Sequence, residues 1–247
     1  MYAVNCTADL RRYVKKMEEK IEAINLDKID RMTLFTFKNA IRLHLDSISL
    51  FNNKSYASAY YLSMIALEEL GKIFLLSDFI WNSRMNGRYN SYKDKELVQI
   101  FGQNLEEGYF KKIVYNHKIK QSRFVRIFDN ELEPSNKYFK KILEGGIENE
   151  KQNSLYVDLK RNGKKIDMTS KIINPLNFNK NKASLQIAII QKCLLELTLM
   201  VSKKYWTSGS DYLDDYLSLK LYRNLKQKWP LNNQKFIKRL QKIENRT

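Results

Sequence analysis

The sequence predicts an all-α fold, a bundle of long helices, from two observations. The chain of 247 residues contains only 8 glycines and 3 prolines, so residues that interrupt helices are rare. Apolar residues also recur at helical spacing along most of the chain. Helices are therefore predicted over residues 9–25, 32–52, 55–84, 94–116 with a continuation or kink into 117–130, 135–148, 180–206, 211–228 and 232–245.

The exception to the helical pattern is a small β-hairpin insertion predicted near 154–168, SLYVDLKRNGKKIDM. Two runs of alternating residues there flank Asn162-Gly163, a dipeptide typical of tight hairpin turns. A two-stranded hairpin is marginally stable alone, so we expect it to lie against the bundle. A loop is predicted just before it, from Gly145-Gly146 through ENEKQN.

Composition suggests three successive parts of the chain, separated where the helical pattern weakens. They are an N-terminal helix at 1–30, a core bundle at 31–206 and a basic helical C-terminal extension at 207–247 that packs on the core. The extension interleaves lysines and arginines with Tyr222, Trp229 and Phe236. That pattern fits either an RNA-binding extension or an amphipathic helix pair with a solvated basic face.

The formal net charge of +17 predicts a polyanionic or acidic partner, such as RNA, the ribosome or an acidic protein. Only two cysteines, Cys6 and Cys193, stand far apart without clustered ligands, so we expect no disulfide framework, no metal and no cofactor. Residues 1–24 carry charges where a signal peptide is apolar. The apolar stretch 185–201 is interrupted by polar residues, which favours a core helix. We therefore expect a cytoplasmic protein that does not associate with membranes.

Three charged residues lie in the middle of an otherwise apolar helical segment, 58–76. On a helical projection Glu69 shares a stripe with apolar residues, and Glu68 and Lys72 lie beside it one turn apart. A buried carboxylate costs several kcal/mol unless it is paired. Lys72 is the expected partner, because it is i+4 from Glu68 and i+3 from Glu69. Two interpretations remain open: a structural ion pair that fixes helix packing, or a functional site.

His117 is the second unusual residue, because it recurs with apolar residues at helical spacing within 110–128. We therefore expect its imidazole to point with the apolar face. Polar and basic residues border that face, namely Lys112, Asn116, Lys120 and Arg123. Nearby cations favour a neutral imidazole and also attract a phosphate. Both a core histidine and a functional histidine fit the pattern. The other histidine, His44, lies on an apolar stripe and is expected to pack in the core.

Several short motifs occur in an order that resembles a known family. ALEELGK at 66–72 is followed by His117-Lys118-Ile119-Lys120, and then by Leu155-Tyr156-Val157-Asp158 ahead of Asn174-Pro175. Their order and spacing resemble the AbiV family of bacterial abortive-infection proteins, which belongs to the HEPN group of α-helical domains. The resemblance covers roughly residues 33–203.

The resemblance implies a HEPN-like bundle that forms a homodimer and acts as an antiphage abortive-infection effector. Its expected activity is that of a metal-independent endoribonuclease or a translation inhibitor, with a phage-encoded protein as activator or target. Many HEPN ribonucleases carry an arginine a few residues before the histidine, whereas this chain has Lys112 in that place. Lysine lacks the bidentate fork of arginine, so this departure counts against nuclease activity.

In the enzyme interpretation His117 acts as general acid or base on RNA, and basic side chains stabilise the phosphate. The predicted catalytic residues are His117, Lys120, Glu69 and Lys72, the predicted phosphate-binding residues are Lys112, Asn116 and Arg123, and Glu68 is structural or orienting. The alternative is a non-catalytic binding protein that captures an acidic phage or host protein or the ribosome.

Overall fold

The computed structural model describes residues 24–85, 91–92, 116–128, 140–142, 146–157, 159, 161–162, 165–229, 238, 241–242 and 245. The helices predicted over 9–25, 94–116 and 232–245 lie largely outside these residues.

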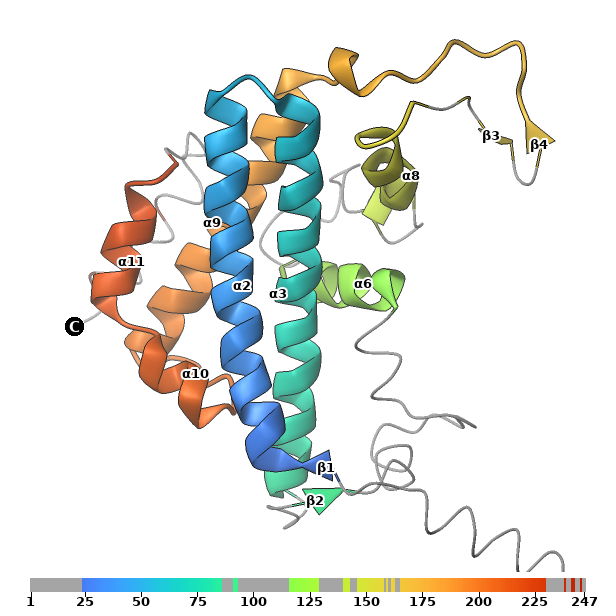
Figure 1. The fold of residues 1–247 in the computed structure, drawn as a ribbon. Coiled ribbons are helices and arrows are strands. Elements are labelled where there is room, and N and C mark those ends of the chain that lie inside the picture. The colour runs from blue at the N-terminus through green and yellow to red at the C-terminus, as the bar shows by residue number, and fades with distance from the viewer. Residues whose placement is uncertain are drawn as a thin grey trace, which may run out of the picture.

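Three long helices form the core of the molecule, and Figure 1 shows α2 and α3 running side by side with α9 behind them. They are α2 (Leu26–Asn52), α3 (Tyr56–Met85) and α9 (Lys180–Ser202). A tight turn joins α2 to α3, with Lys54 at a φ of 63°. The middle of α3 is buried on most sides, as its apolar sequence requires. The predicted all-α bundle is confirmed.

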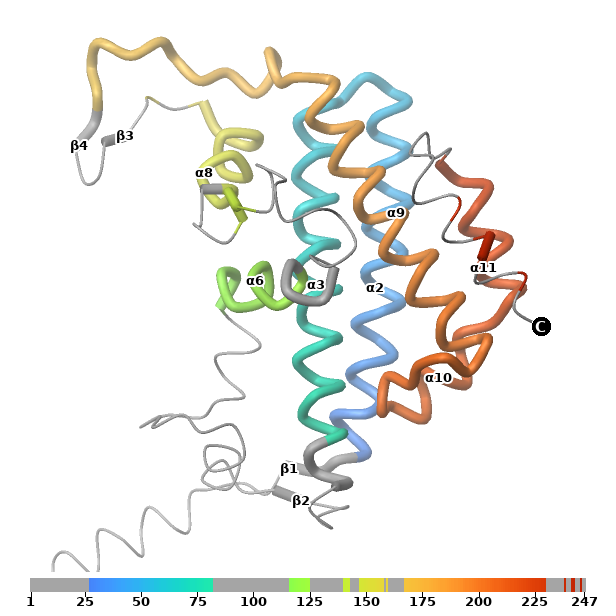
Figure 2. The backbone as a smooth tube through the Cα atoms, turned by 180° about the vertical axis from the view of Figure 1, so that it is seen from behind, coloured from blue at the N-terminus to red at the C-terminus, as the bar shows by residue number. Residues whose placement is uncertain are grey.

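Shorter helices flank this core on two sides, as the rear view in Figure 2 also shows. On one side α6 (His117–Phe128) and α8 (Gly146–Asn153) pack against α3. On the other, α10 (Asp211–Tyr216) contacts α2, and α11 (Leu219–Lys226) contacts α9.

The β-hairpin predicted over 154–168 is not formed as predicted. Residues 154–157 lie in a turn and an irregular segment after α8. Beyond them only a two-residue antiparallel ladder is present, between β3 (Arg161–Asn162) and β4 (Lys165–Ile166). A strand pair with little surface to pack against is marginally stable, which accounts for the shortness of the ladder. A second ladder, not predicted, joins β1 (Ile24–Asn25) to β2 (Ser91–Tyr92).

Two other local predictions are wrong. The loop predicted from Gly145-Gly146 onward is helix α8 from Gly146. The helix predicted over 211–228 is broken before Ser218, whose side chain caps α11 by accepting from the Leu221 N–H. A 3-10 turn, η2 (Pro175–Asn177), follows the β3–β4 ladder and leads into α9.

Two aromatic residues of the C-terminal part, Tyr222 and Trp229, lie toward the core. Tyr222 is buried, and the ring of Trp229 lies 5.1 Å from that of Phe51, centroid to centroid. Lys226 stacks on the Tyr222 ring from the exposed side, 5.5 Å from its centroid. Tyr222 therefore has a buried and a basic side, whereas Phe236 lies outside the described residues.

By length and composition α9 is apolar enough to cross a membrane, and it is the one such helix among the described residues. Within the bundle, 78% of its most apolar window is buried. This burial is what the sequence predicts for a core helix. His44 of α2 is also fully buried, as predicted, with its Nε2 2.6 Å from Oε1 of Gln191 on α9.

Candidate functional site

The candidate site is centred on the carboxylate of Glu68, in the middle of α3. Glu68 is only 2% exposed, so it requires hydrogen-bonding partners. Glu69 and Lys72 are only partly buried. The expected burial is therefore confirmed for Glu68 and wrong for its two charged neighbours.

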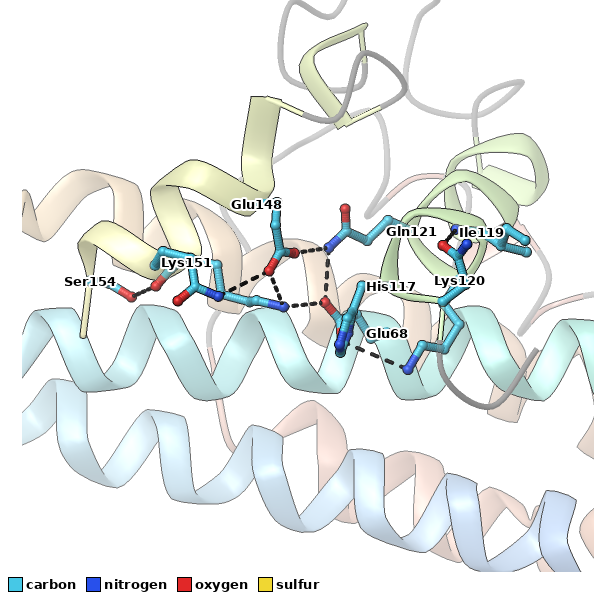
Figure 3. A network of polar contacts seen from close by, with 10 residues as sticks. Glu68, His117, Ile119, Lys120, Gln121, Glu148, Lys151 and Ser154 are labelled. Carbon is cyan, nitrogen blue, oxygen red and sulfur yellow. Dashed lines mark hydrogen bonds and ion pairs between the residues drawn. The ribbon is translucent and has the colours of Figure 1, made fainter. Parts of the chain in front are cut away.

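Side chains from two other helices surround the Glu68 carboxylate, as Figure 3 shows. From α6, Nδ1 of His117 lies 2.6 Å from Oε2, and Nε2 of Gln121 donates to Oε1 at 2.9 Å. From α8, Nζ of Lys151 donates to Oε1 at 2.9 Å. The ammonium of Lys120 lies farther off, 3.9 Å from Oε2. One buried carboxylate thus joins three helices.

The α6 helix begins at the site. Asn116 precedes it, and its side-chain oxygen accepts from the Ile119 N–H at 3.1 Å, a typical N-cap contact. Lys120, Gln121 and Phe124 then point toward α3 and are buried. Burial lowers the pKa of the Lys120 ammonium, and the charges of Glu68 and Glu69 offset this only in part.

His117 does not pack with the apolar face as predicted. Its side chain is 51% exposed, because it occupies the first turn of α6, where only one edge of the ring meets α3. Nδ1 faces a carboxylate that also accepts from Lys151 and Gln121. A carboxylate in this setting acts as an acceptor, so in a neutral ring Nδ1 carries the hydrogen and the lone pair lies on Nε2.

The α8 helix supplies the cation that sequence reasoning missed. Lys151 is 3% exposed and bridges Glu68 to Glu148, whose Oε1 is also 2.9 Å from the ammonium. Burial alone would lower the pKa of Lys151, but hydrogen bonds from its ammonium to Glu68 and Glu148 raise it. Glu148 also accepts from Gln121 at 3.3 Å. Two carboxylates and the ammonium groups of Lys120 and Lys151 therefore balance in charge.

A signal for α8 was present in GIENEKQN. It has an acidic residue in its first turn, a lysine in its last, and an i,i+3 spacing between Glu148 and Lys151. The preceding glycine pair outweighed these features in the prediction of a loop.

The other predicted site residues are placed differently. Among the described residues, no side-chain hydrogen bond or ion pair joins Lys72 to Glu68, although the charge of Lys72 acts on nearby Lys120. Arg123 makes an ion pair with Asp78 of α3, one end of the α6 contact. Lys112 lies outside the described residues. The described part of the chain has no group of three His, Cys, Asp or Glu residues arranged to hold a metal, and Cys193 is buried and free.

The structure is an all-α bundle in which the buried Glu68 of α3 contacts the half-exposed His117 of α6. The family model for AbiV matches residues 28–195. The chain therefore belongs to the AbiV family and is a HEPN-type abortive-infection protein. Comparisons with curated proteins and with solved structures gave no match.

Proposed function

We propose that this protein is an antiphage effector that cleaves RNA without a metal ion and thereby stops translation. The observation that carries the proposal is the pairing of a half-exposed His117 with the buried carboxylate of Glu68. In this proposal the carboxylate fixes the ring and its tautomer, and Nε2 of the half-exposed ring is available to a substrate. A histidine held this way is suited to proton transfer with a bound substrate.

The chemistry is attack of an RNA 2′-hydroxyl on the adjacent phosphorus. Nε2 of His117 takes the hydroxyl proton as the O2′–P bond forms and the P–O5′ bond breaks. The departing 5′-oxygen receives a proton from the solvent or from a second acid. The products are a 2′,3′-cyclic phosphate and a 5′-hydroxyl, so the substrate supplies its own nucleophile.

Glu68 is assigned an orienting role, because it touches Nδ1 and is shielded from solvent. Lys120 and Lys112 are proposed to stabilise charge on the phosphate, and Asn116 to bind it beside His117. Glu69 and Lys72, both partly exposed next to the cluster, remain candidates for orienting the substrate or sharing proton transfer. Arg123 would first have to leave Asp78 to reach a phosphate.

The net charge of +17 supports RNA as the substrate class, because it raises the association rate with polyanions. A homodimer would bring two His117 side chains into one assembly, which offers a second imidazole as the acid. A phage-encoded protein is proposed as the activator.

The test is incubation of purified protein with RNA, with and without phage lysate, followed by mapping of the fragment ends. Fragments should carry cyclic phosphate and 5′-hydroxyl ends, form in chelator, and disappear with folded His117→Ala protein. The matched control is Lys220→Ala, which removes one exposed charge on α11 and should still cleave. Cleavage that survives His117→Ala would refute the assignment.

The competing function is capture of an acidic phage or host protein, or of the ribosome, without catalysis. The presence of Lys112 in the place of the usual arginine favours it. If activated protein protects cells but leaves RNA intact, and His117→Ala protects equally, this function replaces the nuclease.

A further inference from the structure

The backbone of α6 lies close against α3 at Gly71, within the ALEELGK motif. A Cβ atom placed on Gly71 would lie 1.9 Å from the backbone oxygen of Lys120 and 2.7 Å from its carbonyl carbon. Real Cβ contacts do not fall below 3.0 Å. The obstacle is backbone, so no side-chain rotation relieves it. Any residue other than glycine at this position must push α6 away from α3.

The register of the two helices connects this contact to the candidate site. Glu68 lies three residues before Gly71, and His117 lies three residues before Lys120. The contact between Glu68 and His117 is thus one turn from the backbone contact on both helices. One turn further along α6, Arg123 meets Asp78 of α3. The contact at Gly71 therefore lies between the Glu68–His117 and Asp78–Arg123 contacts, which follow the same order along both helices.

We propose that Gly71 is a positioning residue of the His117 site, and that its missing side chain lets Nδ1 of His117 reach Glu68. The inference rests on the proposed function for its catalytic consequence, but its geometric content is independent of RNA. Displacing α6 lengthens the 2.6 Å contact and frees the imidazole to choose its tautomer. A free neutral imidazole prefers hydrogen on Nε2, which removes the lone pair that the chemistry needs.

Alanine at position 71 separates positioning from ordinary helix stability. Glycine inside a helix is less favourable than alanine, so Gly71→Ala should raise the melting temperature if space were available. The close contact with Lys120 predicts instead that Gly71→Ala lowers the melting temperature. Ser58→Ala is the matched control, because Ser58 is exposed on the same helix and its change also improves helix propensity without steric conflict.

The decisive measurement is the ¹⁵N chemical shift of the His117 ring nitrogens at mildly alkaline pH. The parent protein and Ser58→Ala should show hydrogen on Nδ1, and Gly71→Ala should shift it toward Nε2. RNA cleavage, where the parent shows it, should fall on the order of 100-fold, the usual effect of a displacement of about 1 Å in a catalytic group. An unchanged tautomer in folded Gly71→Ala protein overturns the inference.

A second variant covers the case in which Gly71→Ala does not fold. Adding Arg123→Ala releases the far end of α6 from Asp78 and gives the helix room to tilt. If this double variant folds and keeps hydrogen on Nδ1, the inference is again overturned. If the hydrogen moves to Nε2 in this double variant, the result supports the inference. A shifted tautomer in a protein whose parent never cleaves RNA would leave Gly71 a positioning residue and refute only the proposed function.

Discussion

Replacing Lys151 by methionine tests whether the cluster around Glu68 is an interdependent set of buried charges. Methionine matches the length of the lysine stem but has no charge, so it leaves Glu68 and Glu148 without their shared cation. Both partners of the Lys151–Glu68 pair are 2–3% exposed. Removing one partner of a buried ion pair typically costs about 3–5 kcal/mol. For a chain of this size that is a fall in melting temperature of about 6–20 °C.

The assay is thermal and urea unfolding of the parent and of three variants. Lys72→Met is the matched control, because Lys72 is partly exposed and i+4 from Glu68, but its side chain makes no hydrogen bond or ion pair with Glu68 among the described residues. It should melt within about 0.5 kcal/mol of the parent, as surface substitutions do. Glu68→Gln/Lys151→Met removes both charges and should recover much of the loss. If Lys151→Met melts like Lys72→Met, the cluster is solvated and the argument from burial is wrong.

The buried side chains of Glu196 and His44 should make the free energy of unfolding depend on pH in opposite directions. Burial raises the pKa of Glu196 to about 7 from 4.5, so the folded state retains a proton that the unfolded state has lost. Stability should therefore fall by about 3 kcal/mol as pH rises through that window, and Glu196→Gln should remove this slope. Burial lowers the pKa of His44 to about 4 from 6.5, so stability should fall by about 3 kcal/mol as pH drops from 6.5 to 4, and His44→Gln should abolish that fall. Urea titrations across this range check both, and variant slopes equal to the parent's would contradict them. Light scattering at micromolar concentration should give twice the 29.4 kDa chain mass, and a monomer would contradict the proposed dimer. The dimer interface is expected to bury more than about 1,000 Å² in total.

The core of the fold was predictable because its helices are long and strongly periodic. Over α2, α3 and α9, many apolar residues follow the helical spacing of about 3.6 residues, so one residue that departs from it does not change the prediction of a helix. Short elements have no such redundancy. The eight residues of α8 begin at the second glycine of a pair, and the run after it has the alternation of a strand but forms only a two-residue ladder among its described residues. Local patterns therefore failed where tertiary contacts decide the structure.

The site was partly predictable for a similar reason. An ionised residue inside an apolar helix demands partners, and this drew attention to the charged residues at 68–72. His117 was found separately, from its helical spacing with apolar residues. The identity of the partner was not available. Lys72 is four residues away, whereas Lys151 is separated by 83 residues and reaches Glu68 only through the packing of α8. The helical projection placed Glu69 on the apolar stripe and Glu68 beside it, whereas Glu68 is the buried residue. The segment is apolar on almost every side, so the projection does not decide which side faces a neighbouring helix.

Glu68 has two tasks, and the variants must separate them. The same carboxylate holds α8 through Lys151 and orients His117 on α6, so any change at Glu68 alters stability and ring orientation together. Lys151 of α8 contacts Glu68 directly and so affects the first task. Gly71 lies on α3 beside α6, so it affects the second task through the position of His117. A loss of activity in Lys151→Met accompanied by the parent tautomer would indicate lost stability. A loss in Gly71→Ala with a shifted tautomer would instead trace activity to the imidazole itself.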